Sequence, residues 1–389
     1  MNRVLIYIQE NLLAPKGGPL GYNYNLYVQL KQMGCTEFQF LPPQPKRELK
    51  EWRKFVPNII KNIVHEIRKA RSVSRLLSSK YPHKAQIDIN QYDVIHFHDT
   101  KSLYEIRDDL SNYHGKIVLT SHSPTLPSME IYDMLNKREK RMFGWLYKKL
   151  ESMDEYSFRK ADYIFFPCEE AEEPYRNNWP QFSEIKKEKN NSFRYILTGI
   201  QKPVFKKTRE EILLLYNIPK DAVVVSYVGR HNKIKGYDIL KRMAERILSV
   251  YPNVYFLIAG KEEPIRGLEN HRWIEVGWTD DPYSLIAASD LFVLPNRETY
   301  FDLILLEALS IGIPVVCSAT GGNKYFSHIG QKGIFLYDTF NEGTQYISSL
   351  VEKTRQNRKM LGALNKELFE KEFTNEIFAR NYISLIQSL

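Results

Sequence analysis

The sequence predicts an α/β protein made of two domains, each built around a sheet of parallel strands. Its 389 residues exceed what one hydrophobic core usually serves, since single cores stop growing near about 250–300 residues. Short apolar runs alternate with longer segments of helical periodicity, which is typical of strand–helix–strand units. The composition, 43% hydrophobic and 26% charged, is that of an ordinary globular protein. We therefore expect two consecutive α/β domains.

The first half contains four short apolar runs that we interpret as buried strands. They are Val4–Ile8, Val94–Phe97, Ile117–Thr120 and Tyr163–Phe166. A glycine-rich turn with Gly17 and Gly18 lies between the first strand and a helix predicted at Tyr22–Met33. Glycine lets backbone N–H groups approach a ligand closely, but such turns are also common without a ligand. Both interpretations stay open on the turn alone.

The second half repeats the pattern with five predicted strands. They are Val223–Val228, Val254–Ile258, Leu291–Leu294, Val315–Ser318 and Gly333–Leu336. Helices are predicted between them, for example at Leu240–Val250 and Asp302–Ile311. A boundary is expected near Thr198–Lys207, where Pro203 breaks regularity before a helix at Arg209–Tyr216. Ligands of open α/β sheets bind at the carboxyl ends of the strands, so we expect a site in a cleft between two such domains.

Cysteine usage and hydropathy indicate the compartment. The three cysteines, Cys35, Cys168 and Cys317, are far apart and form no CxxC pair, which argues against a disulfide scaffold or a zinc site. The apolar run at the N-terminus is too short for a signal peptide. The tract Phe301–Ala319 contains two acidic residues, which are costly in a bilayer. We therefore expect a cytoplasmic protein without a membrane-spanning helix.

The net charge of +9 comes from one segment. Between Lys46 and Lys84 there are twelve basic and three acidic residues, which alone gives +9. Apolar residues recur there at helical spacing from Ile59 to Leu77, with basic residues along one flank. Such a helix can lie on an anionic membrane surface, or it can pack on its own sheet with a solvated basic face. Nucleic-acid binding ranks last, because no recognition motif accompanies the charge.

The strongest motif is Val228–Gly236, with the sequence VGRHNKIKG. It follows a predicted strand and precedes a predicted helix, so Arg230 and Lys235 would lie on the connecting loop. A guanidinium fork and an ammonium group are what a diphosphate requires. The alternative is a solvated loop that happens to be rich in cations.

A second motif runs from Pro295 to Val316, where a polar loop leads into an amphipathic helix that Gly-x-Pro ends before a strand. The helix would begin near Thr299–Leu303, and its free N–H groups and positive dipole end form a natural anion site. Glu307 lies within this helix among leucines. Its carboxylate needs a partner, and either ribose hydroxyls or a neighbouring lysine would serve.

Three histidines follow or end predicted strands, namely His96, His98 and His122. A metal site is disfavoured, because no carboxylate or cysteine at metal-ligand spacing accompanies them. A structural or site-lining role is favoured instead.

The two motifs together closely resemble those of glycosyltransferase family 4. The family pattern G-R-x-x-x-x-K-G matches Gly229 to Gly236 at every fixed position. Its later pattern, a glutamate, seven residues, a second glutamate and then A-x-x-x-G-x-P-V-V, matches from Glu307 onward. The resemblance is close over residues 200–389 and looser before them. It implies the GT-B fold, in which two Rossmann-like domains face each other across a cleft.

The resemblance also implies roles for individual domains and residues. Residues 1–200 would form the acceptor domain, 201–373 the nucleotide-sugar donor domain, and 374–389 a helix returning to the first domain. The implied catalytic residues are Arg230, Lys235, Glu298 and His122, the last of which matches the family's T-x-H position. The implied donor-binding residues are Gly17, Gly18, Thr299, Tyr300, Asp302, Leu303 and Glu307.

One departure concerns the first family glutamate, which contacts the donor sugar. Counting back eight residues from Glu307 reaches Thr299, and Glu298 is one residue too early. Asp302 stands where the family usually has glycine. We expect a one-residue bulge that lets Glu298 or Thr299 reach the sugar.

The function that the resemblance implies is transfer of a sugar, with retention of configuration, from a UDP-linked or other nucleoside-diphosphate donor to an acceptor hydroxyl. No metal cofactor is expected. The acceptor would be a glycan, a lipid-linked saccharide or a protein, in surface polysaccharide or glycoconjugate synthesis, with peripheral attachment to the inner face of the cell membrane through residues 46–84. The alternative is a non-catalytic GT-B-like protein that binds a partner transferase or a glycan acceptor.

Overall fold

The computed structural model describes residues 2–8, 13, 18–42 and 58–389. Gly17 and residues 46–57 of the basic segment lie outside them. The chain divides into two compact units, described here one at a time. Unit 1 comprises Met1–Phe166, Pro174–Ile196 and Tyr382–Leu389, and unit 2 comprises Pro167–Glu173 and Leu197–Asn381. The short segment Pro167–Glu173 therefore groups with the second half of the chain.

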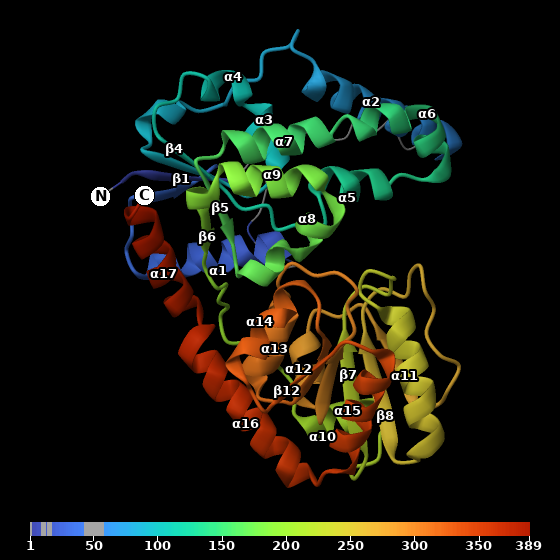
Figure 1. Ribbon diagram of the computed structural model, residues 1–389. Helices are drawn as coiled ribbons and strands as arrows, with labels where there is room; N and C mark the ends of the chain where they lie inside the picture. Colours follow the sequence, from blue (N-terminus) through green and yellow to red (C-terminus); the bar gives the residue numbers. More distant parts are fainter. Residues whose placement is uncertain (1, 9–12, 14–17, 43–57) are drawn as a thin grey trace. The chain divides into compact units, whose positions relative to one another are not determined.

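Unit 1 is built on a sheet of six parallel strands in the order β2-β1-β3-β4-β5-β6. Figure 1 labels β1, β4, β5 and β6 among them. The strands are Val4–Tyr7 (β1), Phe38–Phe40 (β2), Val94–Phe97 (β3), Lys116–Leu119 (β4), Tyr163–Phe166 (β5) and Phe193–Tyr195 (β6). The central strands β1 and β3 are buried along their whole length, which is why their sequences are continuous apolar runs. The edge strands β2 and β6 have three residues each and carry polar residues, and the sequence analysis missed both.

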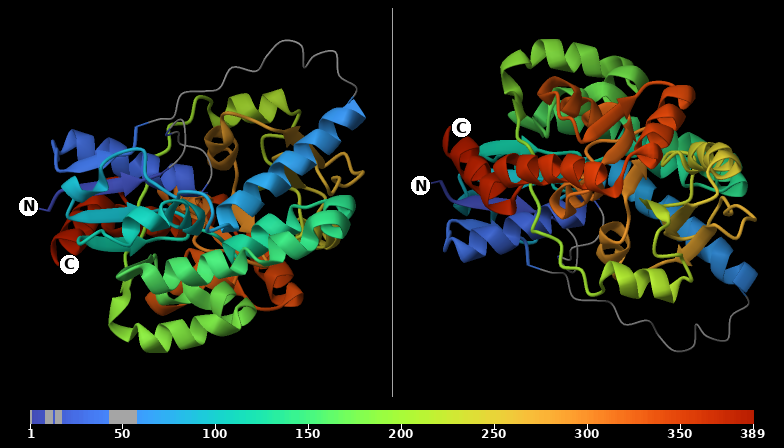
Figure 2. Two further views of the ribbon diagram at one scale, coloured as in Figure 1. Left: turned by 90° about the horizontal axis from the view of Figure 1, so that it is seen from above. Right: turned by 90° about the horizontal axis from the view of Figure 1, so that it is seen from below.

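Helices connect the strands of unit 1, and the chain's C-terminal turns pack against its sheet. The helices are Gly18–Gln32 (α1), Asn58–Leu77 (α2), Thr100–Glu105 (α3), Arg107–Leu110 (α4), Pro127–Asp133 (α5), Lys137–Lys148 (α6), Glu151–Lys160 (α7), Glu173–Asn178 (α8) and Pro180–Glu188 (α9). The last helix, Asn375–Gln387 (α17), belongs to unit 1 from Tyr382 onward. In the last turns of α17, the Tyr382 ring lies 5.8 Å from that of Phe38 and its hydroxyl lies 2.7 Å from His96 Nδ1. Figure 2 shows this end of the chain beside the first strands.

The basic helix α2 packs through its apolar side onto other helices of unit 1. Leu76 is buried in a cluster that also contains Leu135 and Tyr147, from the α5–α6 region. Lys69 forms an ion pair with Glu139 of α6 at 3.6 Å. Arg68, Arg71 and Arg75 are exposed. The later part of this helix thus has an apolar face that is packed and a basic face that meets solvent, and its packing partners are helices rather than the sheet.

Unit 2 repeats the architecture with a second parallel sheet, in the order β12-β11-β10-β7-β8-β9. The strands are Val223–Val228 (β7), Val254–Ala259 (β8), Trp273–Gly277 (β9), Leu291–Leu294 (β10), Val315–Ser318 (β11) and Ile334–Tyr337 (β12). Strand β9 was not predicted from the sequence, and its residues are mostly only half-buried. The helices are Arg209–Leu215 (α10), Tyr237–Val250 (α11), Pro282–Ala287 (α12), Leu303–Ile311 (α13), Tyr325–Ile329 (α14), Phe340–Glu352 (α15) and Arg355–Glu372 (α16).

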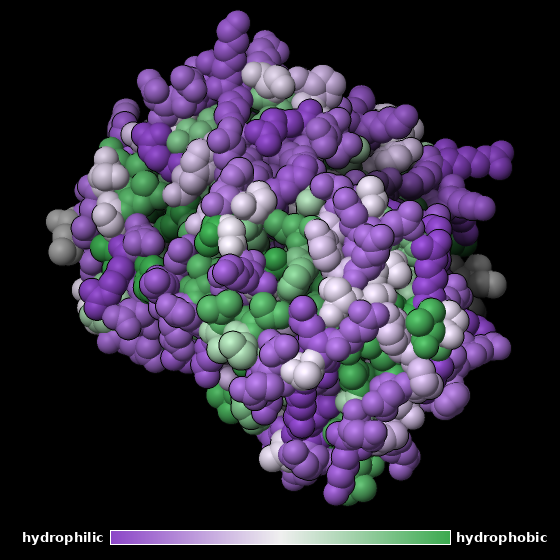
Figure 3. Space-filling model, turned by 60° about the horizontal axis from the view of Figure 1, so that its bottom comes forward, coloured by the Kyte–Doolittle hydropathy of each residue, from purple (hydrophilic) through white to green (hydrophobic). Residues whose placement is uncertain are grey.

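Both faces of the second sheet are covered by helices. Residues of α11 and α15 share one core cluster with β7, β8 and β10, whereas α10 and α12 contribute to a second cluster. Figure 1 labels α11 and α15 beside β7 and β8. This double covering is what a parallel sheet requires, because both of its faces are apolar. Within the described ranges no helix is long and apolar enough to cross a membrane. On the face shown in Figure 3, hydrophilic residues surround separate apolar patches.

Candidate functional site

Two loops of unit 2 that the sequence singled out lie side by side at one edge of the sheet. The first follows β7 and the second follows β10, and these two strands are neighbours. The carboxyl ends of parallel strands meet at the same edge, so the loops converge. The backbone N–H of Arg297 in the second loop donates to the carbonyl of Ile234 in the first at 2.9 Å. Both motifs therefore belong to one site.

An ion pair between Lys235 and Asp302 joins the two loops. The Nζ atom of Lys235 donates to Oδ1 of Asp302 at 2.6 Å, and the side chains are 21% and 10% exposed. The other carboxylate oxygen of Asp302 accepts hydrogen bonds from the Asn296 amide and, at 2.6 Å, from the Thr299 hydroxyl. Asp302 occupies the N-cap position of α13 but makes no side-chain capping bond there. The Asp302 carboxylate thus pairs with the Lys235 ammonium group and does not cap the helix.

Arg230 contributes an exposed guanidinium group to this site. Its side chain is exposed and has no hydrogen-bond or ion-pair partner among the residues that the structure describes. The backbone is held, because its carbonyl accepts from the Tyr227 hydroxyl and from the Asn232 N–H, both at 2.9 Å. A fixed backbone with an unpaired guanidinium is well suited to an incoming anion.

The glycine that ends the first motif is required by the close approach of the loops. Gly236 has a φ of 62°, in the left-handed region, at the N-cap of α11. A Cβ atom built there would lie 1.6 Å from the carbonyl oxygen of Pro295. No other residue fits both the conformation and the space.

The start of α13 is packed on a loop that the sequence analysis missed. Gly321 and Gly322 follow β11, the other neighbour of β10, in a short 3-10 helix (η5, Gly321–Lys324). A Cβ on Gly321 would lie 1.9 Å from the carbonyl oxygen of Thr299, and one on Gly322 would lie 2.2 Å from that of Tyr300. A glycine pair directly after a buried strand was the available signal. These glycines let the loop support the predicted anion site.

The predicted donor-binding residues at the start of α13 differ in exposure. Thr299, Tyr300 and Phe301 are buried, with 1%, 8% and 8% exposed. Glu298 and Leu303 are half-buried. Arg297 anchors this loop, because its guanidinium binds both carboxylate oxygens of Asp238 at 2.6 Å. Whether Glu298 or Thr299 takes the role of the first family glutamate stays a prediction.

Glu307 is a half-buried carboxyl on α13 with one polar neighbour. Its Oε1 accepts a hydrogen bond from the Tyr283 hydroxyl of α12 at 3.2 Å. No cationic side chain of the described part of the chain lies within ion-pair distance of it, so the lysine partner considered above is not seen. Burial raises the pKa of Glu307 to about 8, because removal from water disfavours the charged form. The carboxyl retains acceptor capacity that ribose hydroxyls could use.

The other predicted residues lie in unit 1, where His122 adopts a φ of 54° and is 8% exposed. Its Nε2 lies 2.9 Å from Nδ1 of His98, and the Tyr22 ring packs 4.6 Å away. Burial lowers the pKa of His122 to about 3, so the ring is neutral near pH 7. Gly18 begins α1, and nothing lies within 4 Å of a Cβ built on it. The space around position 18 therefore does not require glycine.

The histidine cluster is organised by hydrogen bonds. Both ring nitrogens of His96 have partners, the Tyr382 hydroxyl at 2.7 Å and the Thr120 hydroxyl at 2.8 Å. Among the described residues, no group of three or more His, Cys, Asp or Glu side chains is arranged to hold a metal ion. Through its two hydrogen bonds, His96 connects α17 with Thr120, the residue that follows β4.

Comparison with known proteins agrees with this architecture. The family model described as Glycosyltransferase Family 4 matches residues 17–185, and that described as Glycosyl transferases group 1 matches residues 222–353. Among curated relatives, the O-antigen biosynthesis glycosyltransferase WclY of Escherichia coli is 24% identical over 187 residues, which cover 45% of this chain and 49% of the relative. The lipopolysaccharide core biosynthesis glycosyltransferase LpsE of Rhizobium meliloti is 26% identical over 178 residues, 44% of this chain and 51% of the relative. The chain spans about half the length of the curated relatives it matches.

Solved structures resemble the whole chain. Sucrose-phosphate synthase from Thermosynechococcus elongatus gives a TM-score of 0.67 at 18% identity and covers 100% of this chain and 99% of its own. Anabaena HepE in complex with UDP-glucose gives 0.63 at 16% identity, with 100% of both chains covered. At these identities the likeness concerns the fold alone. It confirms the predicted two-domain α/β fold as GT-B.

Proposed function

Because this chain belongs to glycosyltransferase family 4, we propose that it transfers a sugar from a nucleoside-diphosphate donor to an acceptor hydroxyl. The observation that carries the proposal is the convergence of three anion-binding features at one sheet edge. These are the unpaired Arg230 guanidinium, the Lys235 ammonium group and the start of α13. A departing diphosphate gains negative charge as the glycosidic bond breaks, and preorganised cations stabilise that charge.

UDP is the proposed nucleotide. It is supported by the Anabaena and Escherichia coli neighbours, whose structures hold UDP-glucose and UDP-2-fluoro glucose. In this proposal the ribose hydroxyls donate to the carboxyl of Glu307, whose burial and single hydrogen bond leave it short of partners. Arg230 and Lys235 supply the positive charge at the diphosphate, so no metal ion or other cofactor is invoked. Retention of configuration is proposed from family membership.

The proposed acceptor is a glycan, a lipid-linked saccharide or a protein, in surface polysaccharide or glycoconjugate synthesis. The relatives from Escherichia coli and Rhizobium meliloti act in O-antigen and lipopolysaccharide core biosynthesis, which supports a saccharide acceptor. The exposed basic face of α2 supports peripheral attachment to an anionic membrane surface, with the protein on its cytoplasmic side.

A test begins with a panel of UDP-sugars and with release of UDP as the readout. We expect slow hydrolysis of one donor by the wild type and a large loss of that rate in Arg230→Ala. Nuclear magnetic resonance of the released sugar, recorded before the anomers equilibrate, would report retention. A protein that binds UDP but hydrolyses none of the donors and transfers to no acceptor would overturn the proposal.

The second candidate function is a non-catalytic GT-B-like protein that binds a partner transferase or a glycan. The Lys235–Asp302 ion pair favours this function, since the ammonium group is already paired with a carboxylate and is less available to a diphosphate. The two candidates differ in the UDP-sugar assay, where only the first gives turnover that depends on Arg230.

A further inference from the structure

A cavity of about 240 Å³ in unit 2 is strongly cationic. Five basic side chains and one carboxylate line it, so their net charge is +4. The basic residues are Lys207, Arg209, Arg355, Arg358 and Lys359, and the acidic residue is Asp290. We refer to this cavity as the basic pocket.

The basic pocket lies at the opposite ends of the strands from the candidate donor site. Its lining includes residues 287 and 289–290, which precede β10, and residues 311–314, which precede β11. The donor loops, by contrast, follow the carboxyl ends of β7 and β10. The basic pocket is therefore a second feature of unit 2, which the proposed transfer reaction does not use.

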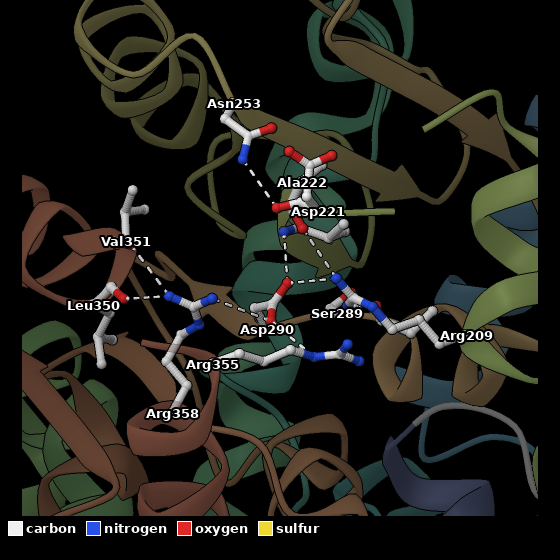
Figure 4. Close-up of polar contacts among 12 residues, drawn as sticks. Arg209, Asp221, Ala222, Asn253, Ser289, Asp290, Leu350, Val351, Arg355 and Arg358 are labelled. Atoms are coloured by element: carbon white, nitrogen blue, oxygen red, sulfur yellow. Dashed lines mark hydrogen bonds and ion pairs between the residues drawn. The ribbon is translucent and has the colours of Figure 1, made fainter. Parts of the chain in front are cut away.

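Two of the arginines are buried around one carboxylate. The side chains of Arg209 and Arg358 are 8% and 6% exposed, and that of Asp290 is 3% exposed. Arg209 Nη2 donates to Oδ2 of Asp290 at 2.9 Å, and Arg358 Nη2 lies 3.4 Å from Oδ1. Figure 4 shows these side chains and Arg355, whose Nε is 4.0 Å from Oδ1, converging on Asp290. One carboxylate cannot neutralise three guanidinium groups, so positive charge remains in excess.

Structural roles account for part of this cluster. Arg358 Nη1 donates to three carbonyl oxygens at the end of α15, and Arg209 donates to two carbonyls that precede strands. The Nε atoms of both arginines nevertheless are buried without a hydrogen-bond partner in the described part of the chain. An unsatisfied donor on a buried charged group is costly. The backbone carbonyls are neutral, so these contacts leave the positive charge of both arginines in place.

The N-terminus of α16 adds to the positive potential. Arg355 is the first residue of this 18-residue helix, and Arg358 and Lys359 follow in its first turns. The positive end of the helix dipole thus lies at the basic pocket. Lys207 has a distant carboxylate neighbour, Asp281, at 3.9 Å, which offsets its charge only in part.

We propose that the basic pocket binds a phosphate monoester group. Such a group carries about −1.5 to −2 charge near pH 7 and has three acceptor oxygens. The two N–H groups of a guanidinium match the spacing of two phosphate oxygens. The cavity of 240 Å³ has room for a phosphate group, because a water molecule in the liquid occupies only about 30 Å³. The phosphate group of a soluble metabolite and that of a lipid headgroup share this chemistry.

The test is calorimetric titration of the full chain with inorganic phosphate. The variant is Arg355→Gln combined with Lys359→Gln, because both side chains are exposed and their neutralisation leaves the buried pair intact. We expect phosphate affinity to fall at least about tenfold, as for the loss of charge-assisted hydrogen bonds. The matched control is Lys371→Gln, which removes an exposed lysine from the same helix outside the basic pocket and should bind like the wild type.

Three results of the titrations would overturn the proposal, and a competition with UDP gives a fourth. The three are an absence of phosphate binding, equal affinity in the wild type and the double variant, and equal loss in the Lys371→Gln control. Saturating UDP should leave phosphate binding intact, and complete displacement by UDP would instead assign the phosphate to the donor site. Vesicles of phosphatidylcholine with and without phosphatidic acid separate the sources. If the protein binds only vesicles with phosphatidic acid and the double variant does not bind them, the ligand of the basic pocket is a lipid headgroup. If the protein binds phosphate but no vesicles, the ligand is a soluble metabolite.

Discussion

Replacing Glu307 by glutamine should make the protein more stable at neutral pH and make UDP binding weaker. The carboxyl is half-buried, has one hydrogen-bond donor at 3.2 Å, and has a pKa raised by burial from 4.5 to about 8. The folded state therefore holds a proton that the unfolded state releases. Between these two pKa values the unfolded state binds fewer protons, so the free energy of unfolding falls as pH rises. Below the pKa of 4.5 this carboxyl does not change the stability, and above the pKa of about 8 the loss of stability is complete and no longer depends on pH.

The slope of this fall has an upper limit of about 1.4 kcal/mol per pH unit for one group. Glutamine has no proton to lose, so Glu307→Gln should lack this fall. A destabilisation of 1 kcal/mol shifts the thermal midpoint by about 2–4 °C in a domain of this size. The midpoint of the variant should thus match that of the wild type near pH 5 and exceed it by several degrees near pH 8. Thermal unfolding followed by circular dichroism at a series of pH values measures this difference.

UDP binding tests the proposed role of the same carboxyl. Ribose hydroxyls donate hydrogen bonds, which favours the ionised form, so the UDP-induced rise in the wild-type midpoint should grow between about pH 7 and 9. In Glu307→Gln that pH dependence should disappear and the rise should be smaller. The matched control is Glu245→Gln, an exposed glutamate on α11, which should follow the wild type in both measurements. If the thermal midpoints of the wild type and Glu307→Gln changed equally with pH, the argument from burial would be refuted. If UDP raised both midpoints equally, Glu307 would not bind the ribose.

Three further predictions concern the charged groups. Arg230→Ala should unfold near the wild-type temperature, and Lys235→Ala should unfold at a lower temperature, because it leaves the Asp302 carboxylate without its ion-pair partner. Both variants should transfer sugar at least about a hundredfold slower, measured as initial rates of UDP release, and retained activity in either would show that the residue has no role in the mechanism. Asp302→Asn should bind UDP about tenfold more tightly by calorimetry, because it frees Lys235 for the diphosphate, and unchanged affinity would show that the lysine is not in contact with it. The Lys46–Lys84 segment should give salt-sensitive sedimentation with anionic vesicles, at about 1 kcal/mol per basic residue near the surface; equal binding to neutral vesicles would contradict this.

The fold was predictable from the sequence because its central strands are buried on both faces and so read as continuous apolar runs. The edge strand β2 and the half-buried β9 lack that signal, since short or exposed strands carry mixed residues. The position of Gly236 was predictable from the motif, and its left-handed backbone and the nearby Pro295 carbonyl give the physical reason for glycine there. The Lys235–Asp302 ion pair was not, because it depends on which strands are neighbours, and 67 residues separate the two side chains in the chain.

The departures from the family pattern at positions 299 and 302 can be understood together. The family pattern has glutamate at the first position and glycine at the second, whereas this chain has threonine and aspartate. The Thr299 hydroxyl donates to the Asp302 carboxylate at 2.6 Å, so the two positions that depart from the family pattern are in direct contact. The loop thus has two carboxylates, Glu298 and Asp302, and that of Asp302 lies beside Lys235. Because two anions cannot both pair fully with one ammonium group, donor affinity and the position of this carboxylate are coupled. Asp302→Asn measures that coupling directly, since it removes the charge and keeps the side-chain shape.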